Sequence, residues 1–493
     1  MNDDLLVEIF DFCRPDNISP NTYPRNWWYT LSHVCQRWRR VLFATPVRLG
    51  ISLVCNSRTP VKELLAKSPP LPLIIYWGNP GTFDEDDSVK SVLCALKHPD
   101  RVRRITLHMS GSSLRKIFSS VKGPFPILET LQLYCSFASS PRISPGMFEA
   151  PSLRHLQLSD LTFLSFAQLL NTNAITHPSI VTFSLGEITA KPVVLLVLLE
   201  QMPLLKVLKI GVSFSIPSER TERNERGLLK GNQPESASLD LPNLEEFEYQ
   251  GTSDYLEAIA ARITARFLKK LTIEVSNAVN HPDAATFKYL SLLISGAADL
   301  AFQFARVRFK DGFSIVMDHD ELWTGRGAFE LIFKHRGYYF DANIGLVANI
   351  CRVLAPMPST VQSLLLEDGN RNNWESKPDR GGWLELLRVY DNIKTLRVAG
   401  RFVESLNEAL EPDNEGFAVQ TLLPRLQEIV RYGPKSEFAA FVKDRQIAGS
   451  PVQVVSGPQG RLTLFKRWFK HRKTKRSDDD ALSPSIHPHP DTF

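Results

Sequence analysis

A short phrase of apolar positions recurs along most of this chain and organises its sequence. The phrase is an apolar residue, two residues of any kind, an apolar residue, one residue of any kind and a third apolar residue. From about Leu49 to Val455 it recurs as Val102/Ile105/Leu107, Leu128/Leu131/Leu133, Leu153/Leu156/Leu158, Ile180/Phe183/Leu185, Leu205/Leu208/Ile210, Leu244/Phe247/Tyr249, Leu268/Leu271/Ile273, Val361/Leu364/Leu366 and Ile393/Leu396/Val398. Alternation of this kind predicts a β-strand with one buried face.

The spacing of the phrase indicates a repeat protein. Counted from Val102 to Leu205, successive copies begin 26, 25, 27 and 25 residues apart, which is the period of leucine-rich repeats. Helical stretches lie between copies, as at residues 163–170 and in the apolar run 192–199. Strand, helix and strand at a fixed period predict parallel strands with crossover helices. We therefore expect an α/β fold in which residues 49–455 form an irregular leucine-rich-repeat solenoid after an N-terminal helical domain.

The period is interrupted in three places. Polar insertions with few apolar anchors predict loops at about residues 215–240 and 370–382. From Phe304 to Phe340 the phrase gives way to shorter alternating runs, with turn sequences at Asp311-Gly312 and at residues 325–327. We expect strands joined by tight turns there, in place of regular repeats.

Two amphipathic stretches precede the repeats. The first, within residues 3–13, has an apolar stripe at helical spacing made of Leu5, Leu6, Ile9, Phe10 and Cys13. The second follows Trp27-Trp28-Tyr29 and has a stripe made of Leu31, Val34, Cys35, Trp38 and Leu42. A pair of helices this short cannot bury both stripes alone, so we expect it to dock on another surface.

The sequence of this region, DDLLVEIFDFC followed by LSHVCQRWRRVLFATPVRL, resembles the F-box. It is similar in particular to the N-terminal F-box of the large F-box-like families of mushroom-forming fungi. The resemblance implies that residues 1–48 bind the small adaptor Skp1 and so join a cullin-based ubiquitin ligase. Carried over by position, the adaptor-binding residues are Leu5, Leu6, Ile9, Phe10, Leu31, Val34, Cys35, Trp38 and Leu42. The family pattern has Leu-Pro where this chain has Met1-Asn2, and often a shorter link than residues 15–25.

The resemblance extends to the C-terminal part of the chain. Family members often contain a W-x-x-L-L helix, then a strand, the sequence LLPRLQEI and a closing helix, which match residues 383–387, 422–429 and 437–446 here. The alternative for the N-terminal helices is a cap, because repeat domains need polar-faced ends. A cap accounts for the stripes but not for the Trp38-Arg39 ending, so we favour adaptor binding.

Residues that alternate with the apolar phrase are the candidates for binding a target protein. In a solenoid they face the concave surface, which is rigid and wide. The candidates are Gln132, Tyr134, His155, Gln157, Lys209, Glu246, Glu248, Glu274, Glu367 and Arg397. The four glutamates give this surface an acidic bias, from which we hypothesise a basic segment in the target. The alternative is that these polar faces are simply solvated.

Charge and cysteine usage bear on location. Seven basic residues between Lys466 and Arg476 exceed the net charge of +5, so the rest of the chain carries −2. This basic stretch belongs to a tail at residues 456–493, whose last part has a composition typical of disordered segments. The stretch has three interpretations: a nuclear import signal, a basic helix on an acidic surface, or a charged soluble terminus. Without a basic stripe elsewhere, nucleic acid is not an expected partner. Six cysteines without CxxC spacing predict reduced thiols in a cytoplasmic or nuclear protein.

Sequence motifs for other functions are missing. The longest aliphatic run, residues 193–199, is far shorter than the roughly 20 residues that span a bilayer, and residues 1–14 lack the pattern of a secretory signal. There is no GxxxxGK[ST], GxGxxG, GxSxG or HExxH, and the acidic run 84–87 lacks the alternating ligands of a calcium loop. We expect no enzyme activity, metal or cofactor.

The sequence therefore predicts a substrate-recognition subunit of an SCF-type ubiquitin ligase. We expect a monomer within a hetero-complex of a Skp1-like adaptor, a cullin and an unknown target protein. One alternative is a leucine-rich-repeat scaffold that is not coupled to ubiquitination. A weaker one is a nucleic-acid or chromatin-associated factor that uses the basic tail.

Overall fold

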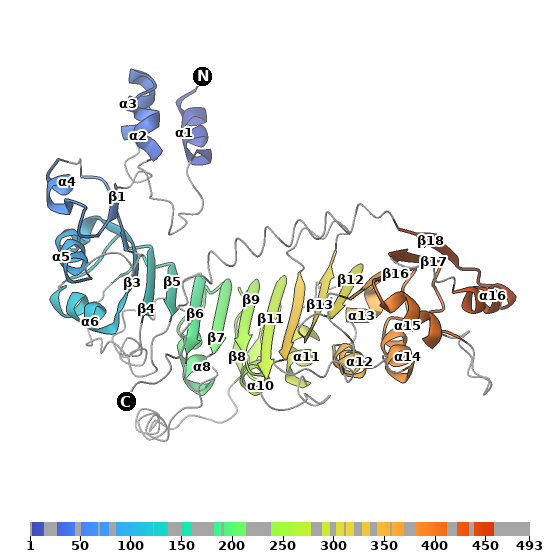
Figure 1. The fold of residues 1–493 in the computed structure, drawn as a ribbon. Helices are drawn as coiled ribbons and strands as arrows, with labels where there is room; N and C mark the ends of the chain where they lie inside the picture. The colour runs from blue at the N-terminus through green and yellow to red at the C-terminus, as the bar shows by residue number, and fades with distance from the viewer. Residues whose placement is uncertain are drawn as a thin grey trace, which may run out of the picture. The chain divides into compact units, whose positions relative to one another are not determined.

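The computed structural model describes residues 2–13, 27–44, 51–67, 70–77, 85–121, 123–136, 150–159, 182–188, 192–212, 238–277, 288–295, 302–309, 312–319, 328–335, 343–354, 357–368, 380–411, 422–432 and 438–457. The chain divides into two compact units. Figure 1 labels their helices and strands. Unit 1 comprises Met1–His281 and Ala285–Leu300, and unit 2 comprises Pro282–Ala284 and Ala301–Phe493.

In the N-terminal stretch of unit 1, the described residues form three helices: α1 (Asp3–Phe12), α2 (Trp27–Ser32) and α3 (Gln36–Ala44). Both α1 and α2 pack against α3. The second predicted amphipathic helix is divided, because a turn lies between Ser32 and Gln36. The Cys35 thiol accepts a hydrogen bond from the Trp38 backbone N–H at 3.4 Å, which satisfies one of the free donors at the start of α3. Val34 and Cys35 therefore lie in a turn and not on a helix face.

Unit 1 contains a parallel sheet in which each strand pairs with the next. Its order is β1 (Ile51–Val54), β2 (Leu73–Trp77), β3 (Val102–Ser110), β4 (Thr130–Ser136), β5 (His155–Ser159), β6 (Thr182–Ile188), β7 (Val207–Val212), β9 (Glu246–Gly251) and β11 (Lys270–Asn277). A separate pair is formed by β8 (Leu239–Asp240) and β10 (Ile263–Thr264). The predicted α/β fold with parallel strands is confirmed.

The register of the sheet follows the apolar phrase. The second apolar residue of each copy pairs with its equivalent on the next strand, in the series Ile105, Leu131, Leu156, Phe183, Leu208, Phe247 and Leu271. The third residue of each copy follows in the same way, from Leu107 to Ile273. A shift by one residue would expose the whole apolar set, so this match fixes the register.

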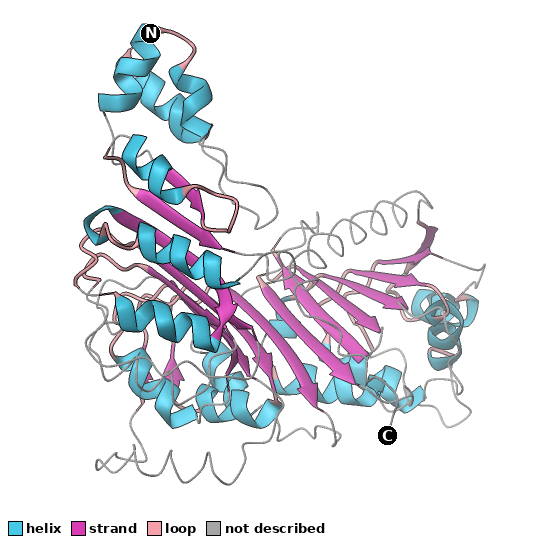
Figure 2. Cartoon of the chain, turned by 60° about the vertical axis from the view of Figure 1, so that its left-hand side comes forward, coloured by secondary structure: helices cyan, strands magenta, loops and turns pink. Residues whose placement is uncertain are grey.

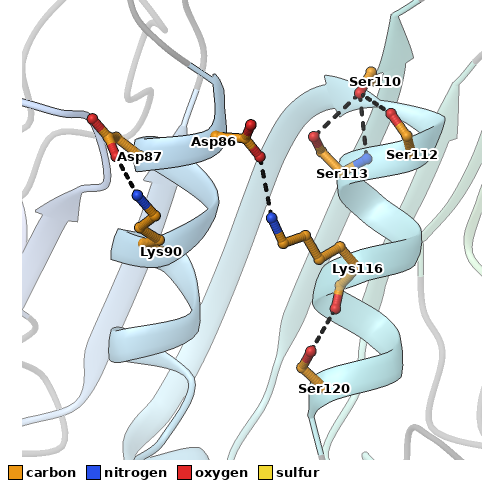
Figure 3. A network of polar contacts seen from close by, with 8 residues as sticks. All are labelled: Asp86, Asp87, Lys90, Ser110, Ser112, Ser113, Lys116 and Ser120. Carbon is orange, nitrogen blue, oxygen red and sulfur yellow. Dashed lines mark hydrogen bonds and ion pairs between the residues drawn. The ribbon is translucent and has the colours of Figure 1, made fainter.

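Crossover helices cover one side of this sheet (Figure 2). They are α4 (Val61–Lys67), α5 (Glu85–Ala95), the short 3-10 helix η2 (Pro99–Arg101), α6 (Gly111–Ser120), α8 (Pro192–Glu200), α10 (Ser253–Ala260) and α11 (Lys288–Ser295). Ser110 caps α6 by accepting a hydrogen bond from the Ser113 N–H, and Lys116 of α6 forms an ion pair with Asp86 of α5 at 3.1 Å (Figure 3). Four leucines of α8 are buried, as the apolar run predicted.

Unit 2 combines antiparallel and parallel pairing. The strands β12 (Phe304–Phe309), β13 (Gly312–Asp318) and β14 (Phe329–His335) pair antiparallel, which confirms the predicted hairpins. Gly312 has a φ of 129°, and a Cβ there would collide with the Phe333 carbonyl oxygen, so the turn requires glycine. From β12 the ladder continues in parallel through β15 (Ser363–Asp368), β16 (Thr395–Ala399), β17 (Glu428–Tyr432) and β18 (Gln453–Ser456).

The helices in the described part of unit 2 are α12 (Asn343–Val353), α13 (Met357–Thr360), α14 (Arg380–Val389), α15 (Phe402–Ala409) and α16 (Ala439–Ile447). The W-x-x-L-L element lies in α14 as predicted, with Trp383 fully buried and edge-on to Phe402 at 5.1 Å between ring centroids. Both predicted loops are wrong at their ends: residues 239–240 form β8, and Arg380–Gly382 begin α14 because the apolar face of that helix extends to Gly382. The remainder of both insertions, the predicted helix at 163–170, the turn at 325–327 and the tail beyond Gly457 lie outside the described residues.

Side-chain hydrogen bonds also join neighbouring repeats, just before the apolar phrase begins. We call these hydrogen bonds the polar ladder. Ser152, Asn243 and Asn392 each precede the first apolar residue of a phrase, and each side chain donates a hydrogen bond to a carbonyl of the preceding described repeat. The acceptors are the carbonyl oxygens of Pro126, Pro203 and Ser359, each two residues before a phrase, at 2.7, 2.9 and 2.6 Å. The repeats are thus joined by equivalent side-chain bonds in both units.

Candidate protein-interaction surfaces

The helical cluster α1–α3 has a small apolar core of its own. Leu6, Phe10, Val41 and Leu42 are buried, and the Phe10 ring lies edge-on to Trp38 at 5.1 Å between centroids. Three of the residues predicted to bind the adaptor, Leu6, Phe10 and Leu42, therefore stabilise the cluster itself. Trp38 is half-buried beside them.

A second apolar set remains at the surface of the same cluster. Leu5 is 48% exposed and Phe12 is 93% exposed, with the half-buried Ile9 between them on one face of α1. Val34 in the turn before α3 is 56% exposed, and Cys35 beside it is exposed. We call Leu5, Ile9, Phe12 and Val34 the exposed apolar set. Leu31 is half-buried.

The sequence interpretation missed two exposed aromatic residues here. Phe12 and Phe43 are exposed on α1 and α3 but were not among the predicted adaptor residues. The signal for Phe12 was present, because it follows Leu5 by seven residues and Ile9 by three, which places all three on one helix face.

Exposed ion pairs attach α1 to α3. The Asp3 carboxylate accepts hydrogen bonds from Arg37 Nη2 at 2.7 Å and Nε at 3.0 Å, and Arg40 lies 3.9 Å away. Arg39 Nε donates to the Ser32 carbonyl at 3.0 Å. Surface pairs of this kind contribute about 0–1 kcal/mol each, so they orient the helices more than they stabilise them.

The residues that alternate with the core phrase form an outward face on each sheet. In unit 1 its first part is an uncharged ladder: Thr106 donates to Gln132 at 2.9 Å, and Gln132 donates to Gln157 at 2.9 Å. Two residues further along the same two strands, His108 stacks on Tyr134 with 4.0 Å between ring centroids. Burial lowers the pKa of His108 to about 4, so this imidazole is neutral at physiological pH.

The second part of this face is charged, but its charges are paired. Lys209 binds Glu248 at 2.7 Å and Lys270 binds Glu246 at 3.3 Å, each across neighbouring strands. Glu274 is only 3% exposed and accepts a hydrogen bond from Gln250 at 3.2 Å. The predicted position of Glu274 on an open surface is wrong, because this part of β11 is covered. The acidic bias expected from these glutamates is offset by the two lysines.

In unit 2 the predicted residues Glu367 and Arg397 lie on the outward face of β15 and β16. Glu367 is nearly buried and accepts hydrogen bonds from Arg306 of β12, with 3.0 Å between Arg306 Nε and Glu367 Oε2. Arg397 is half-buried. Glu367 is therefore not an open acidic position either, because its charge is taken up by a buried arginine.

The cysteines are free thiols; Cys55 and Cys135 are buried in unit 1, and Cys351 is buried in unit 2. Burial raises the pKa of Cys55 far above its usual range and that of Cys351 to about 12. Among the described residues there is no group of three or more His, Cys, Asp or Glu side chains that could hold a metal ion. Within the same residues, every helix is too short or too polar to span a bilayer.

Comparisons with known proteins add little at this level of similarity. No protein-family model and no curated protein matches the sequence. The leucine-rich repeat-containing protein LegL7 from Legionella pneumophila superposes with a TM-score of 0.27 and 12% identity, over 80% of this chain and 97% of that one. A protein from Bacteroides fragilis gives a TM-score of 0.22 and 11% identity, over 80% and 68% of the two chains. The assignment of a repeat fold rests on the strand register described above.

Proposed function

We propose that this protein is a non-enzymatic substrate-recognition subunit of an SCF-type (Skp1–cullin–F-box) ubiquitin ligase. Its helical cluster binds a Skp1-like adaptor, and its repeat sheets hold a target protein. The chain contributes positioning: a target lysine held near activated ubiquitin gains effective concentration, without a bond-making residue from this protein.

One observation carries the proposal: the helical cluster keeps an apolar set exposed after its own core is complete. Leu6, Phe10 and Leu42 are buried, while Leu5, Phe12 and Val34 are not. Burying each of these exposed side chains in an interface contributes about 1.5–3 kcal/mol. The set lies in the segment whose sequence resembles the F-box, which gives the partner its identity in this proposal.

The test is recovery of a purified Skp1-like adaptor on the immobilised full-length chain. Leu5→Asp combined with Phe12→Asp places two charges in the exposed apolar set and should abolish recovery without unfolding α1. Leu292→Asp is the matched control, because Leu292 of α11 is also an exposed leucine, at 59%. This control should retain the adaptor. Undiminished recovery by the double variant would reject the ligase function.

The alternative is a repeat scaffold whose helices act only as a cap. The observation that favours it is the burial of Leu6, Phe10 and Leu42 inside the cluster, since these residues stabilise the cluster and are not exposed to a partner. Affinity purification with and without residues 1–45 separates the two functions. A ligase subunit loses adaptor and cullin when the helices are removed, whereas a scaffold recovers the same set of proteins in both cases.

A further inference from the structure

Two exposed apolar side chains occupy equivalent places in unit 1. Leu204 directly precedes the phrase of β7 and is 50% exposed, and Phe267 directly precedes the phrase of β11 and is 60% exposed. Only β9 lies between these two strands, and Asn243 has the same place before its phrase. Neighbouring strands are about 4.8 Å apart, so Leu204 and Phe267 lie about 10 Å apart along the edge of the sheet where the strands begin.

A row of charges runs beside this apolar pair, two residues further along each chain segment. The Glu245 N–H donates to the Lys206 carbonyl and the Lys269 N–H donates to the Glu245 carbonyl, both at 2.8 Å. The Glu245 carboxylate lies 3.7 Å from Lys206 Nζ and 3.0 Å from Lys269 Nζ, and both lysine side chains remain more than half exposed. The row thus carries two cations and one carboxylate. We call Leu204, Lys206, Phe267 and Lys269 the rim patch.

Charge alone does not distinguish the rim patch. Arg103, Glu129 and Arg154 have the same phrase positions in the repeats of β3, β4 and β5, and they also amount to two cations and one carboxylate. The residues directly before those phrases are Arg101, Ile127 and Ser152, of which only Ile127 is apolar, at 37% exposed. The pair of large apolar side chains beside the cations is therefore the distinguishing feature. The row at β3–β5 serves as an internal control.

The exposed face of α1 has a matching pattern. Leu5 and Phe12 of the exposed apolar set are seven residues apart, so they lie about 10.5 Å apart along the helix axis. Two exposed acids, Asp4 and Glu8, lie beside them. At about 100° of rotation per residue, Glu8 is about 60° and Asp4 about 100° from Leu5 in the same direction. The buried Leu6 lies in the opposite direction. An apolar strip therefore runs next to an acidic strip, with nearly the spacing of the rim patch.

We propose that the rim patch binds the exposed face of α1 of a second copy of this chain. The apolar pair of the rim patch packs against Leu5 and Phe12, and its lysines face the acids Asp4 and Glu8. The two surfaces differ, so the contact is head-to-tail and each copy offers one of each. Self-association goes beyond the proposed function. Its consequence for that function, that an adaptor and a second copy compete for α1, rests on the proposed adaptor binding.

The first test is analytical ultracentrifugation of the purified full-length chain over a dilution series. The average mass should rise above that of one copy as the concentration increases, and the association should be weak because the interface is small. Phe267→Asp should weaken self-association by about tenfold or more. Ile127→Asp is the matched control, because it places the same charge directly before an equivalent phrase, and its effect should stay within about twofold. A chain that stays monomeric, or equal losses in the two variants, would overturn the proposal.

A mixing experiment tests the head-to-tail geometry. One variant, Leu5→Asp with Phe12→Asp, has a disrupted α1 face and an intact rim patch. The other, Leu204→Asp with Phe267→Asp, has the reverse. Each variant alone should be monomeric. Their mixture should form a complex of one copy of each that grows no further, because its two remaining surfaces are disrupted. A mixture that stays monomeric would reject a contact between copies.

Charge reversal tests the contribution of the lysines. Lys269→Glu should weaken self-association by about tenfold, and added salt should weaken it in the unchanged chain. Arg154→Glu is the matched control, because it makes the same charge change in the equivalent row, which has the same two cations and one carboxylate. Its effect should stay within about twofold. Equal losses would show that overall charge and not the rim patch drives the association.

The outcome is separable from that of the proposed ligase function. Self-association is measured without an adaptor, and the rim patch is not part of the adaptor-binding cluster. Leu204→Asp with Phe267→Asp should therefore abolish self-association and retain the adaptor. A chain that binds the adaptor but stays monomeric would refute only the contact between copies. A chain that self-associates but does not recover the adaptor would refute only the ligase function.

Discussion

The helical cluster and the sheet of unit 1 differ in how completely they bury their apolar side chains. In the sheet, phrase residues such as Leu133, Leu158 and Ile210 are at most 2% exposed, because each strand is covered by the next repeat. In the cluster, Phe12 on α1 is 93% exposed. A module of this size has too little core to cover all its apolar residues. The sheet can thus stand as a rigid frame, whereas the cluster suits a role in which a partner completes its packing.

The largest effect should follow from a cavity in the sheet. Phe247 of β9 is 2% exposed and aligned between Leu208 and Leu271, so Phe247→Ala should lower the free energy of unfolding by about 3–5 kcal/mol. Phe267→Ala is the control, because that phenylalanine directly precedes the next phrase and is 60% exposed, and it should cost less than about 0.5 kcal/mol. Urea denaturation of both variants measures the difference. Similar losses would mean that the sheet is not packed as described.

A smaller and more local effect is expected in the helical cluster. Phe10→Ala removes the ring that packs edge-on against Trp38, at a cost of about 3 kcal/mol to the cluster. Because the cluster is small, this loss should open α1 and α3 while the sheet stays folded. Hydrogen exchange should speed up at the amides of these helices and remain slow in β3 and β4.

Phe12→Ala is the matched control for Phe10→Ala. Its side chain lies on the exposed side of α1, so hydrogen exchange in the isolated protein should not change. With a bound adaptor, however, Phe12→Ala should reduce protection of α1. If the free protein were equally sensitive to both substitutions, the separation into a buried and an exposed apolar set would be wrong.

The architecture could be predicted from the sequence, because each copy of the repeated phrase marks one strand and its place in the sheet. Once Phe247 and Leu271 are recognised as equivalent, their alignment on adjacent strands follows, and so does that of Glu246 with Lys270. The ion pair between these last two was therefore available from the period alone. The acidic bias predicted for these glutamates is offset by lysines on neighbouring strands, because Lys270 lies 24 residues after Glu246 and Lys209 lies 39 residues before Glu248.

Other features depend on packing that the sequence pattern does not encode. Leu5 and Leu6 belong to one apolar stripe, and only the placement of α3 makes Leu6 buried and Leu5 exposed. Glu274 occupies the same kind of alternating position as Glu246, but the tertiary surroundings of β11 cover it. The split of the second N-terminal helix at Cys35 rests on a thiol cap that residue spacing does not indicate.

The smallest expected effect on stability tests whether the polar ladder, in addition to the apolar phrase, holds neighbouring repeats in register. Asn243→Ala removes the hydrogen bond from Asn243 Nδ2 to the Pro203 carbonyl and should cost about 0.5–1 kcal/mol, since the group is partly solvated. Asn243→Ser restores a donor of the kind found at Ser152 and should recover part of the loss. The readout is the urea midpoint at constant slope, which reports stability without a change in the surface exposed on unfolding. If alanine and asparagine gave the same midpoint, the side-chain ladder would add nothing to stability, and the apolar phrase alone would hold neighbouring repeats in line. Among the described residues of the helical cluster no such repeated bond is found, so the same substitution should leave hydrogen exchange in α1–α3 unchanged.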